Sequence, residues 1–175
     1  MGDNVIGIFG FGSLSKEIIW SEDDTHLYKL IGQIIANAIN RKEMNEELIS
    51  NEYQFRSVWE NSFDAMRLTD ETGKLIEVNK AFGKLVNMEK ENLLGQSFGV
   101  IYEDYKQNNS LIQYINFFDS RATKDNYETL LSLWDGRKLW VEVSTTFTEG
   151  KDGQIFLLTI FRDINSKKLA ESSLI

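Results

Sequence analysis

Two short runs of strand-forming residues flank a turn signal in the middle of this 175-residue chain, at 65–69 and 74–78. The segment between them, Asp70-Glu-Thr-Gly73, carries the Asp and the Gly that tight turns use. Asn79 follows the second run, and its side-chain oxygen can accept from the free N–H groups of a helix start. Apolar residues then recur at helical spacing, namely Phe82, Leu85 and Val86. The sequence therefore predicts a β-hairpin followed directly by a capped helix.

Three more strands are expected after the hairpin, near 127–134, 138–148 and 154–162, because apolar runs there are separated by Asp-Gly turn signals. Segment 89–95 is predicted to be a short helix that ends on a glycine, and segment 103–118 to be irregular or weakly helical. Five strands in this order give one antiparallel sheet, with the short helices grouped between its second and third strands. The predicted fold class is α+β, with the helices on one face of the sheet.

A long helix is expected before the hairpin, and the absence of proline removes one common helix breaker. Ser21 can cap its start, and Asp24 stands at the acceptor position of a capping box. The acids at 22–24 also suit the positive end of the helix dipole. One apolar face recurs at spacings of three and four and is expected to be buried: Leu27, Leu30, Ile31, Ile34, Ile35, Ala38 and Ile39.

The same helix carries an imperfect heptad seam. Its two rows are Ile34, Arg41, Leu48 and Phe55, and Leu30, Asn37, Met44 and Asn51. The polar members are compatible with a parallel two-helix coil of modest stability, which would make the protein a homodimer. A solvated single helix that bridges two modules is the alternative. In both cases the helix is a rod that joins two parts of the protein.

Several spaced motifs resemble the PAS sensor domain family. They are the lead-in from Phe55 to Ser62, the run Val78-Asn-Lys-Ala-Phe82, the turn after Asp135 and the closing Arg162-Asp-Ile-Asn165. The resemblance covers about residues 54–165, and residues 166–175 look like the start of an exit helix. Residues 1–20 resemble the C-terminal tail of a GAF domain, with 21–53 as a linker or signalling helix. A natural N-terminal extension is the alternative for residues 1–20.

The PAS resemblance implies a sensory and dimerisation module of a multidomain, cytoplasmic signal-transduction protein. A histidine kinase is the first candidate for the parent, and the sensor input of a diguanylate cyclase is the second. Binding of a small-molecule ligand or a partner would shift the packing of the sheet on its flanking helices, and other domains of the parent chain would receive that shift. The rival is an interaction or spacer domain with a filled core that binds no ligand. No catalytic activity is expected of this fragment.

The candidates for lining a ligand cavity between sheet and helices are Met66, Leu68, Ile76, Val78, Phe82, Val86, Leu139, Val141, Val143, Ile155 and Leu157. The same residues would fill a core if no cavity is present. Arg67 is expected to point away from Met66 and Leu68, toward solvent or an acid on the outer face. An apolar patch for a partner subunit or a flanking helix is expected at Trp140, Phe156, Leu158 and Ile160. The PAS resemblance implies that Asp163, with Arg162, fixes the junction with the exit helix.

Charge and composition argue against several other functions. The net charge of -8 argues against nucleic acid, and no apolar run approaches the length needed for membrane insertion. The chain has no cysteine, which argues against a cysteine-linked flavin and excludes thiolate metal sites. Its single histidine, His26, lies outside 54–165, so a haem there would lack its usual axial ligand. A helix start explains the acids at 22–24 without a metal.

Overall fold

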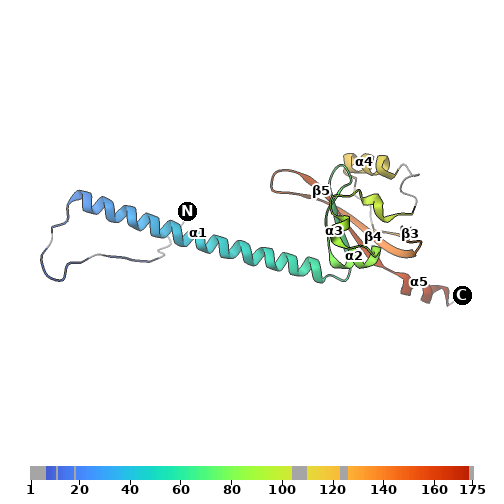
Figure 1. Ribbon diagram of the computed structural model, residues 1–175, viewed down its shortest axis with the longest axis horizontal. Coiled ribbons are helices and arrows are strands. Elements are labelled where there is room, and N and C mark those ends of the chain that lie inside the picture. Colours follow the sequence, from blue (N-terminus) through green and yellow to red (C-terminus); the bar gives the residue numbers. More distant parts are fainter. Residues whose placement is uncertain (1–6, 11, 18, 104–109, 123–125, 174–175) are drawn as a thin grey trace. The chain divides into compact units, whose positions relative to one another are not determined.

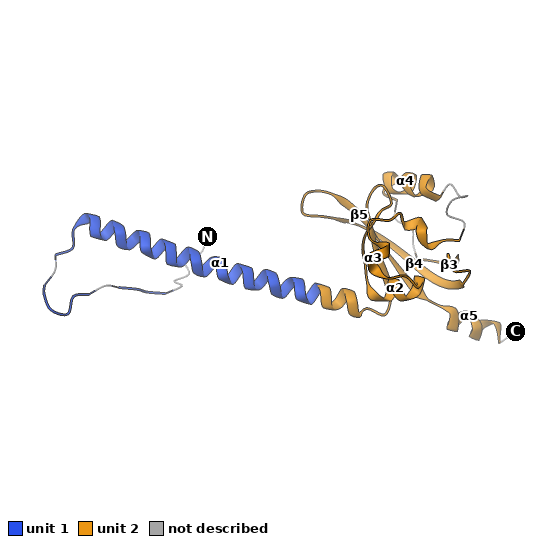
Figure 2. Cartoon of the chain, in the orientation of Figure 1, with its two compact units in different colours: residues 1–55 blue, residues 56–175 orange. Residues whose placement is uncertain are grey.

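The structure is a computed structural model that describes residues 7–10, 12–17, 19–103, 110–122 and 126–173. Its contacts divide the chain into two compact units, residues 1–55 and residues 56–175 (Figure 2). Helix α1, Glu22–Asn61, runs beyond the predicted end at residue 53, and its last turns belong to the second unit. Among residues 1–20, the described ones, 7–10, 12–17 and 19–20, form neither helix nor strand.

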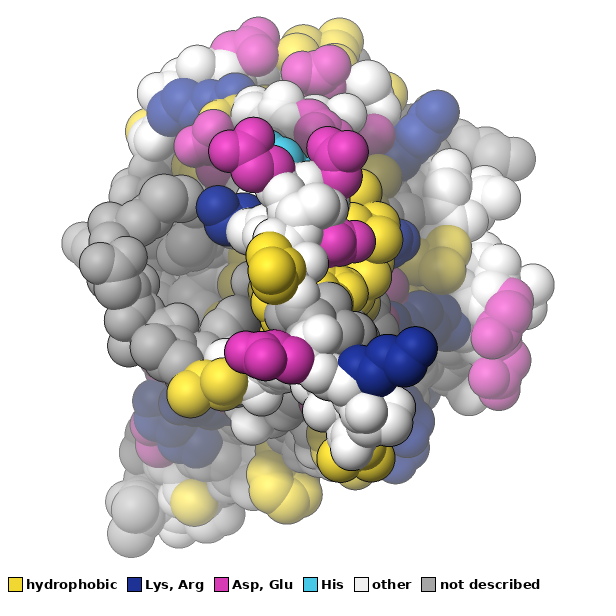
Figure 3. All heavy atoms as spheres, turned by 90° about the vertical axis from the view of Figure 1, so that its left-hand side faces the viewer, with side chains coloured by type: hydrophobic (Ala, Val, Ile, Leu, Met, Phe, Trp, Pro, Cys, Tyr) yellow, Lys and Arg dark blue, Asp and Glu magenta, His cyan; other side chains and the backbone are white. Residues whose placement is uncertain are grey.

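The predicted capping box at the start of α1 is confirmed. The Asp24 amide donates to the Ser21 hydroxyl at 3.1 Å, and the Ser21 amide donates to the Asp24 carboxylate at 2.9 Å. Hydrogen bonds from the side chain and backbone of Ser21 lower the pKa of Asp24. The apolar face predicted to be buried is instead exposed in the single chain, with Leu27, Leu30 and Ile34 each more than half exposed. Figure 3 shows acidic and hydrophobic side chains exposed together at this end of the molecule.

The second unit contains a five-stranded antiparallel sheet in the order β2-β1-β5-β4-β3, which confirms the predicted fold class (Figure 1). The strands are β1 Ala65–Thr69, β2 Leu75–Val78, β3 Tyr127–Ser132, β4 Lys138–Glu149 and β5 Ile155–Asp163. The first and last strands along the chain, β1 and β5, are thus neighbours inside the sheet, because β1 pairs with both β2 and β5.

Short helices lie between β2 and β3, as the sequence predicted (Figure 1). They are α2 Lys80–Val86, α3 Lys90–Leu93, the 3-10 helix η1 Phe98–Ile101 and α4 Ser110–Ser120, and α5 Asn165–Ser172 follows β5. Segment 103–118 is more regular than predicted, since α4 occupies its second half, while residues 104–109 lie outside the described part of the chain. Tyr114 and Phe118, one turn apart, are the buried residues that hold α4 against the sheet.

The hairpin turn and the helix cap after it form as the residues predicted. The Asp70 carboxylate accepts from the amides of Thr72 and Lys74, each at 2.9 Å, and Gly73 takes the left-handed conformation with φ +79°. Asn79 Oδ1 accepts from the Phe82 amide at 2.9 Å and so caps α2. The turn therefore sets the start of β2, and the cap sets the start of α2.

The core lies between the sheet and these helices. Its fully enclosed members come from every layer: Leu75, Val78, Phe82, Val86, Leu93, Ile101, Leu133 and Val141. The two faces of β4 differ, since Val141 and Val143 are buried while Trp140, which was predicted for the outer patch, is 37% exposed. Leu139 and Phe147 pack against the edge of the same core.

The predicted orientation of β1 is wrong, and the register of the sheet explains why. Arg67 lies opposite Thr159 of β5, a buried residue, and directly opposed residues share one face of a sheet. Arg67 is therefore buried on the core side, only 6% exposed, instead of facing outward. Met66 and Leu68 lie on the outer face, half-buried, and Ile76 of β2 is 41% exposed. The prediction placed the most apolar residues of β1 inside, and the pairing with β5 places them outside.

Candidate functional site

A cavity of about 200 Å³ lies between the inner face of the sheet and α4. Strands β1, β3, β4 and β5 contribute to its walls, so it spans most of the sheet. The cavity is lined by Arg67, Tyr102, Tyr114, Phe117, Tyr127, Thr129, Leu131, Val143, Thr145, Leu157, Thr159 and Phe161. The mixture of apolar walls with a few polar groups is typical of small-molecule sites.

Arg67 is the one charged residue among these lining residues. Its guanidinium carbon lies 5.1 Å from the centre of the Phe98 ring and 5.0 Å from that of Phe161, distances at which a cation and a ring attract each other. Its Nε and Nη1 atoms are buried and donate to no partner among the described residues. A buried charge without a counter-ion is costly, so the rings compensate it only in part.

Two threonines, Thr145 and Thr159, line the cavity together with Arg67 on the sheet side. Thr159 lies opposite Arg67 across β1 and β5, and Thr145 lies opposite Thr159 across β5 and β4. Their Oγ1 atoms are buried, and neither has a hydrogen-bond partner in the described part of the protein. Three adjacent strands thus present a cation and two hydroxyls in one row, a combination that ordinary core packing avoids.

The cavity tyrosines differ from these groups because Tyr114 already has its partners. The Tyr114 hydroxyl donates to the Asp70 carbonyl oxygen at 2.7 Å and lies 2.8 Å from Thr69 Oγ1. Burial raises the pKa of Tyr114 and also that of Tyr127, so both stay protonated at neutral pH. Tyr114 therefore ties α4 to the turn after β1, while its ring forms part of the wall.

The structure divides the predicted cavity residues into three groups. Val143 and Leu157 line the cavity. The other buried candidates belong to the filled core or its edge: Val78, Phe82, Val86, Val141, Leu139 and Ile155. Met66, Leu68 and Ile76 lie outside, as described above. Sequence reasoning missed the polar lining residues, although Arg67 was visible as a charge within an apolar strand.

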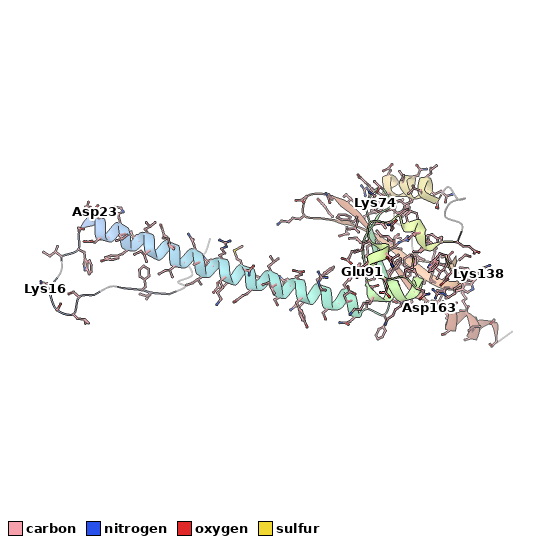
Figure 4. The ribbon with its side chains drawn as sticks, viewed as in Figure 1. Lys16, Asp23, Lys74, Glu91, Lys138 and Asp163 are labelled. Carbon is pink, nitrogen blue, oxygen red and sulfur yellow. The ribbon has the colours of Figure 1, made fainter. Side chains whose placement is uncertain are left out.

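The junction between β5 and α5 is built from Arg162, Asp163 and their partners. Arg162 donates from Nε and Nη2 to the two carboxylate oxygens of Asp64, at 3.1 and 2.8 Å. The Asp163 carboxylate accepts from the Asn165 amide at 2.8 Å, at the point where β5 continues into α5 (Figure 4). The Asn165 side chain in turn accepts from the Trp140 amide at 3.0 Å. Asp64 precedes β1, so this network joins the chain segments that enter and leave the domain.

Buried Asn79 attaches the end of α1 to the domain. Its Nδ2 donates to the carbonyl oxygens of Trp59 at 3.1 Å and Asp64 at 2.9 Å, while its Oδ1 also accepts from the Met66 amide at 2.9 Å. Together with the cap on α2, one side chain thus contacts α1, β1 and α2. The hydrogen bonds use every donor and acceptor of the amide group.

The exit helix α5 is attached to the sheet by charged residues. Glu128 of β3 forms ion pairs with Lys167 and Lys168, and its hydrogen bonds to these two lysines lower the pKa of Glu128 to about 2. Lys168 Nζ also lies 5.4 Å from the centre of the Trp140 ring. At the predicted outer patch, Trp140 is thus contacted by Lys168 of α5 but stays exposed, while Phe156, Leu158 and Ile160 are half-buried in the single chain.

The described residues offer little for a metal site or a membrane span. No group of three or more His, Cys, Asp or Glu side chains there could hold a metal ion, and His26 is exposed on α1. None of the described helices combines the length and the apolar character that crossing a membrane would need.

Comparison with known proteins gives consistent results. A PAS domain family model matches residues 64–166. Sporulation kinase E of Bacillus subtilis (strain 168) is 27% identical over 161 residues, which cover 91% of this chain and 21% of that protein. Sensor histidine kinase TmoS of Ectopseudomonas mendocina is 22% identical, over 93% of this chain and 16% of its own length. The chain thus spans only a small part of these curated relatives.

Among solved structures, the PAS domain of an HTR-like protein from Haloarcula marismortui matches with a TM-score of 0.58 and 22% identity, over 70% of this chain and 99% of that one. A PAS domain of a protein from Colwellia psychrerythraea matches with a TM-score of 0.51 and 26% identity, over 65% and 97% of the two chains. The family model and the solved structures thus both indicate a PAS domain. The sheet order and the helices between β2 and β3 are consistent with that fold. This chain belongs to the PAS domain family, and its curated relatives include a sporulation kinase and a sensor histidine kinase.

Proposed function

We propose that this chain is the sensory and dimerisation module of a cytoplasmic multidomain signal-transduction protein, with a histidine kinase as the parent. The observation that carries the sensory part is the cavity around Arg67, whose lining includes buried polar groups without partners in the described residues. A spacer domain gains nothing from such groups, because each lowers stability unless something binds to it. The similarity to two kinases supports the choice of parent.

The route from cavity to output follows two neighbouring strands. Phe161 lines the cavity, and Arg162, the next residue of β5, reaches Asp64 on the other side of the strand. Arg67 lines the cavity from β1, three residues after Asp64. A ligand that repositions these two strands would therefore act on both ends of the Asp64–Arg162 pair. The signal would leave through α1 and α5, by a shift between two populated packings.

Dimerisation through α1 is part of the same proposal. Leu30, Ile34, Leu48 and Phe55 of the heptad seam are each more than half exposed in the single chain. A parallel coil with a second copy would bury this seam, although its polar members limit the stability of the coil. In that arrangement the two copies of α1 would transmit the state of the domains as a pair.

Native mass spectrometry of the purified chain tests the proposal in one spectrum. A dimer that carries a defined additional mass, released on denaturation, is the expected result. A dimer without any bound molecule would favour the spacer function and count against a ligand sensor. A monomer at micromolar concentration would contradict the coiled coil, and repeating the measurement on residues 56–175 alone would show whether α1 is needed.

A further inference from the structure

The row formed by Arg67, Thr159 and Thr145 suggests what the cavity binds. We infer that the ligand is a small monocarboxylic acid whose carboxylate is held by Arg67 and whose compact apolar body fills the rest of the cavity. This inference rests on the proposed sensory function and specifies the class of ligand at the same site. The observation behind it is that Arg67 is only 6% exposed and has no counter-ion among the described residues.

The charge of the site selects an anion. The described lining residues include one cation and no acid, so a neutral or positively charged ligand would leave Arg67 uncompensated. One carboxylate balances one guanidinium, and the planar guanidinium can donate two parallel hydrogen bonds to it. A second negative charge would find no partner among the described lining residues. A monocarboxylate therefore fits better than a dicarboxylate.

The two hydroxyls complete the polar end of the site. Directly opposed residues in an antiparallel sheet have their Cβ atoms about 4.5–5.5 Å apart, so Thr159 lies beside Arg67 and Thr145 lies beside Thr159. A hydroxyl can donate to a carboxylate oxygen that the guanidinium leaves free. A carboxylate bound at one edge of the guanidinium would thus give a partner to Arg67 Nε or to Arg67 Nη1, and could also give partners to the buried hydroxyls Thr145 Oγ1 and Thr159 Oγ1.

Size and the remaining walls limit the body of the ligand. A volume of about 200 Å³ corresponds to roughly seven water molecules at about 30 Å³ each. Leu131, Val143 and Phe117 supply apolar and aromatic surface. Butyrate and benzoate have the required charge, size and apolar body, and they serve as probes. Butyramide, benzamide and benzylamine have nearly the same shapes but lack the negative charge.

Thermal unfolding of the full chain with each probe tests the inference. We expect butyrate or benzoate to raise Tm in a concentration-dependent way, and the amides and the amine to leave it unchanged. Equal shifts with amides and acids would overturn the carboxylate assignment while leaving a ligand sensor intact. No shift with any acid at millimolar concentration would also overturn it, and the native mass spectrum decides separately whether another ligand is bound.

Variants of Arg67 separate ligand recognition from a structural role. Arg67→Met removes the charge with little change in length, so it is expected to raise Tm without ligand and to abolish the shift with the acids. Arg67→Lys keeps the charge but cannot donate two parallel hydrogen bonds to one carboxylate. We therefore expect it to bind the acids at least about tenfold more weakly. Arg137→Gln, an exposed arginine outside the cavity, is the control and should bind like the wild type. A lower Tm for Arg67→Met together with an undiminished acid shift would refute the role of Arg67.

Should Arg67→Met fail to fold, Thr159→Val offers a second test. This change keeps the shape of the side chain and removes a hydroxyl that has no described partner. We expect the fold to tolerate it, since no described hydrogen bond is lost, and acid binding to weaken about three- to tenfold. Thr72→Val, on the exposed hairpin turn, removes a hydroxyl that does not line the cavity and should leave acid binding unchanged. Unchanged binding in Thr159→Val would contradict the proposed contacts.

Discussion

Arg162 and Asp64 are joined by two hydrogen bonds, between Nη2 and Oδ2 at 2.8 Å and between Nε and Oδ1 at 3.1 Å. Asp64 stands between α1 and β1, and Arg162 stands one residue before the end of β5. The pair therefore links the entry and the exit of the domain in a single contact. Glu142 lies 3.8 Å from the same guanidinium and adds a second, weaker attraction.

The Asp64–Arg162 pair should matter more for coupling than for stability. Arg162 is well exposed, so breaking the pair by Asp64→Asn is expected to lower the free energy of unfolding only slightly. A double-mutant cycle with Arg162→Gln, measured by denaturant unfolding at low and high salt, gives the interaction energy. A value that does not weaken in high salt would contradict the view of an exposed, screened pair.

Asp163→Ala should loosen the start of α5 without unfolding the domain. The Asp163 carboxylate accepts from the Asn165 amide and so satisfies one of the free N–H groups of the first helical turn. Loss of such a contact costs about 0.5–2 kcal/mol locally. Hydrogen exchange should therefore become faster in residues 165–168 and stay the same in β1. Unchanged exchange in α5 would show that Asp163 does not fix the junction.

Replacement of Asn79 is expected to lower the stability of the domain more than replacement of Asp64, Asp163 or Glu128. Asn79→Ala removes the cap on α2 and leaves the carbonyl oxygens of Trp59 and Asp64 without their amide donor. Each buried group left without a partner costs about 1–3 kcal/mol, so a total loss of about 2–4 kcal/mol is expected. Chemical denaturation measures it. Asn92→Ala on α3, at an exposed asparagine, is the matched control and should change stability by less than about 0.5 kcal/mol.

The attachment of α5 to β3 should depend on acid. The folded-state pKa of Glu128 is lowered from 4.5 to about 2 by Lys167 and Lys168. A lowered carboxyl pKa contributes stability that is fully present above the unfolded value and is lost as pH falls through the folded one. We therefore expect α5 to exchange faster as pH falls from about 4.5 to about 2, after correction for intrinsic exchange. Glu128→Gln should remove this dependence, and a wild-type profile in the variant would contradict the assignment.

Alanine substitutions at Gly73 and Gly136 allow the cost of backbone strain to be distinguished from the cost of a steric clash. Gly73 and Gly136 have φ of +79° and +80°, so alanine at either position is strained. A Cβ at Gly73 would lie 2.9 Å from Phe98, one of the rings that contact Arg67, whereas nothing lies within 4 Å of one at Gly136. Gly136→Ala is expected to cost about 1 kcal/mol and Gly73→Ala about 1–3 kcal/mol more. Equal decreases in stability for the two variants, measured by thermal unfolding, would mean that the Phe98 side chain moves aside at little cost.

The fold could be predicted because local signals and long-range pairing agree. Turn residues such as Gly73 mark where strands end, and the Asn79 cap and the Ser21–Asp24 capping box follow from side-chain chemistry over a few residues. The alternation on β4 was clear for the same reason, since only one of its faces is apolar. These features need no knowledge of which strands become neighbours.

The site could not be predicted in the same way. Both faces of β1 carry residues that can be buried, and the choice between them depends on the pairing of Arg67 with Thr159, ninety-two positions later in the sequence. Hydrophobicity alone favoured Met66 and Leu68 for the inside. The row of Arg67, Thr159 and Thr145 exists only in the register of three strands, so no local pattern reveals it.

The proposed function requires that the state of the cavity reaches the Asp64–Arg162 junction. Hydrogen exchange of the wild-type chain, with and without a saturating concentration of benzoate or whichever probe acid raises Tm most, tests it directly. We predict slower exchange in the cavity strands together with changed exchange at residues 56–64 and 162–172. Slower exchange confined to the cavity strands, with both junction segments unchanged, would contradict a coupling between the cavity and the junction.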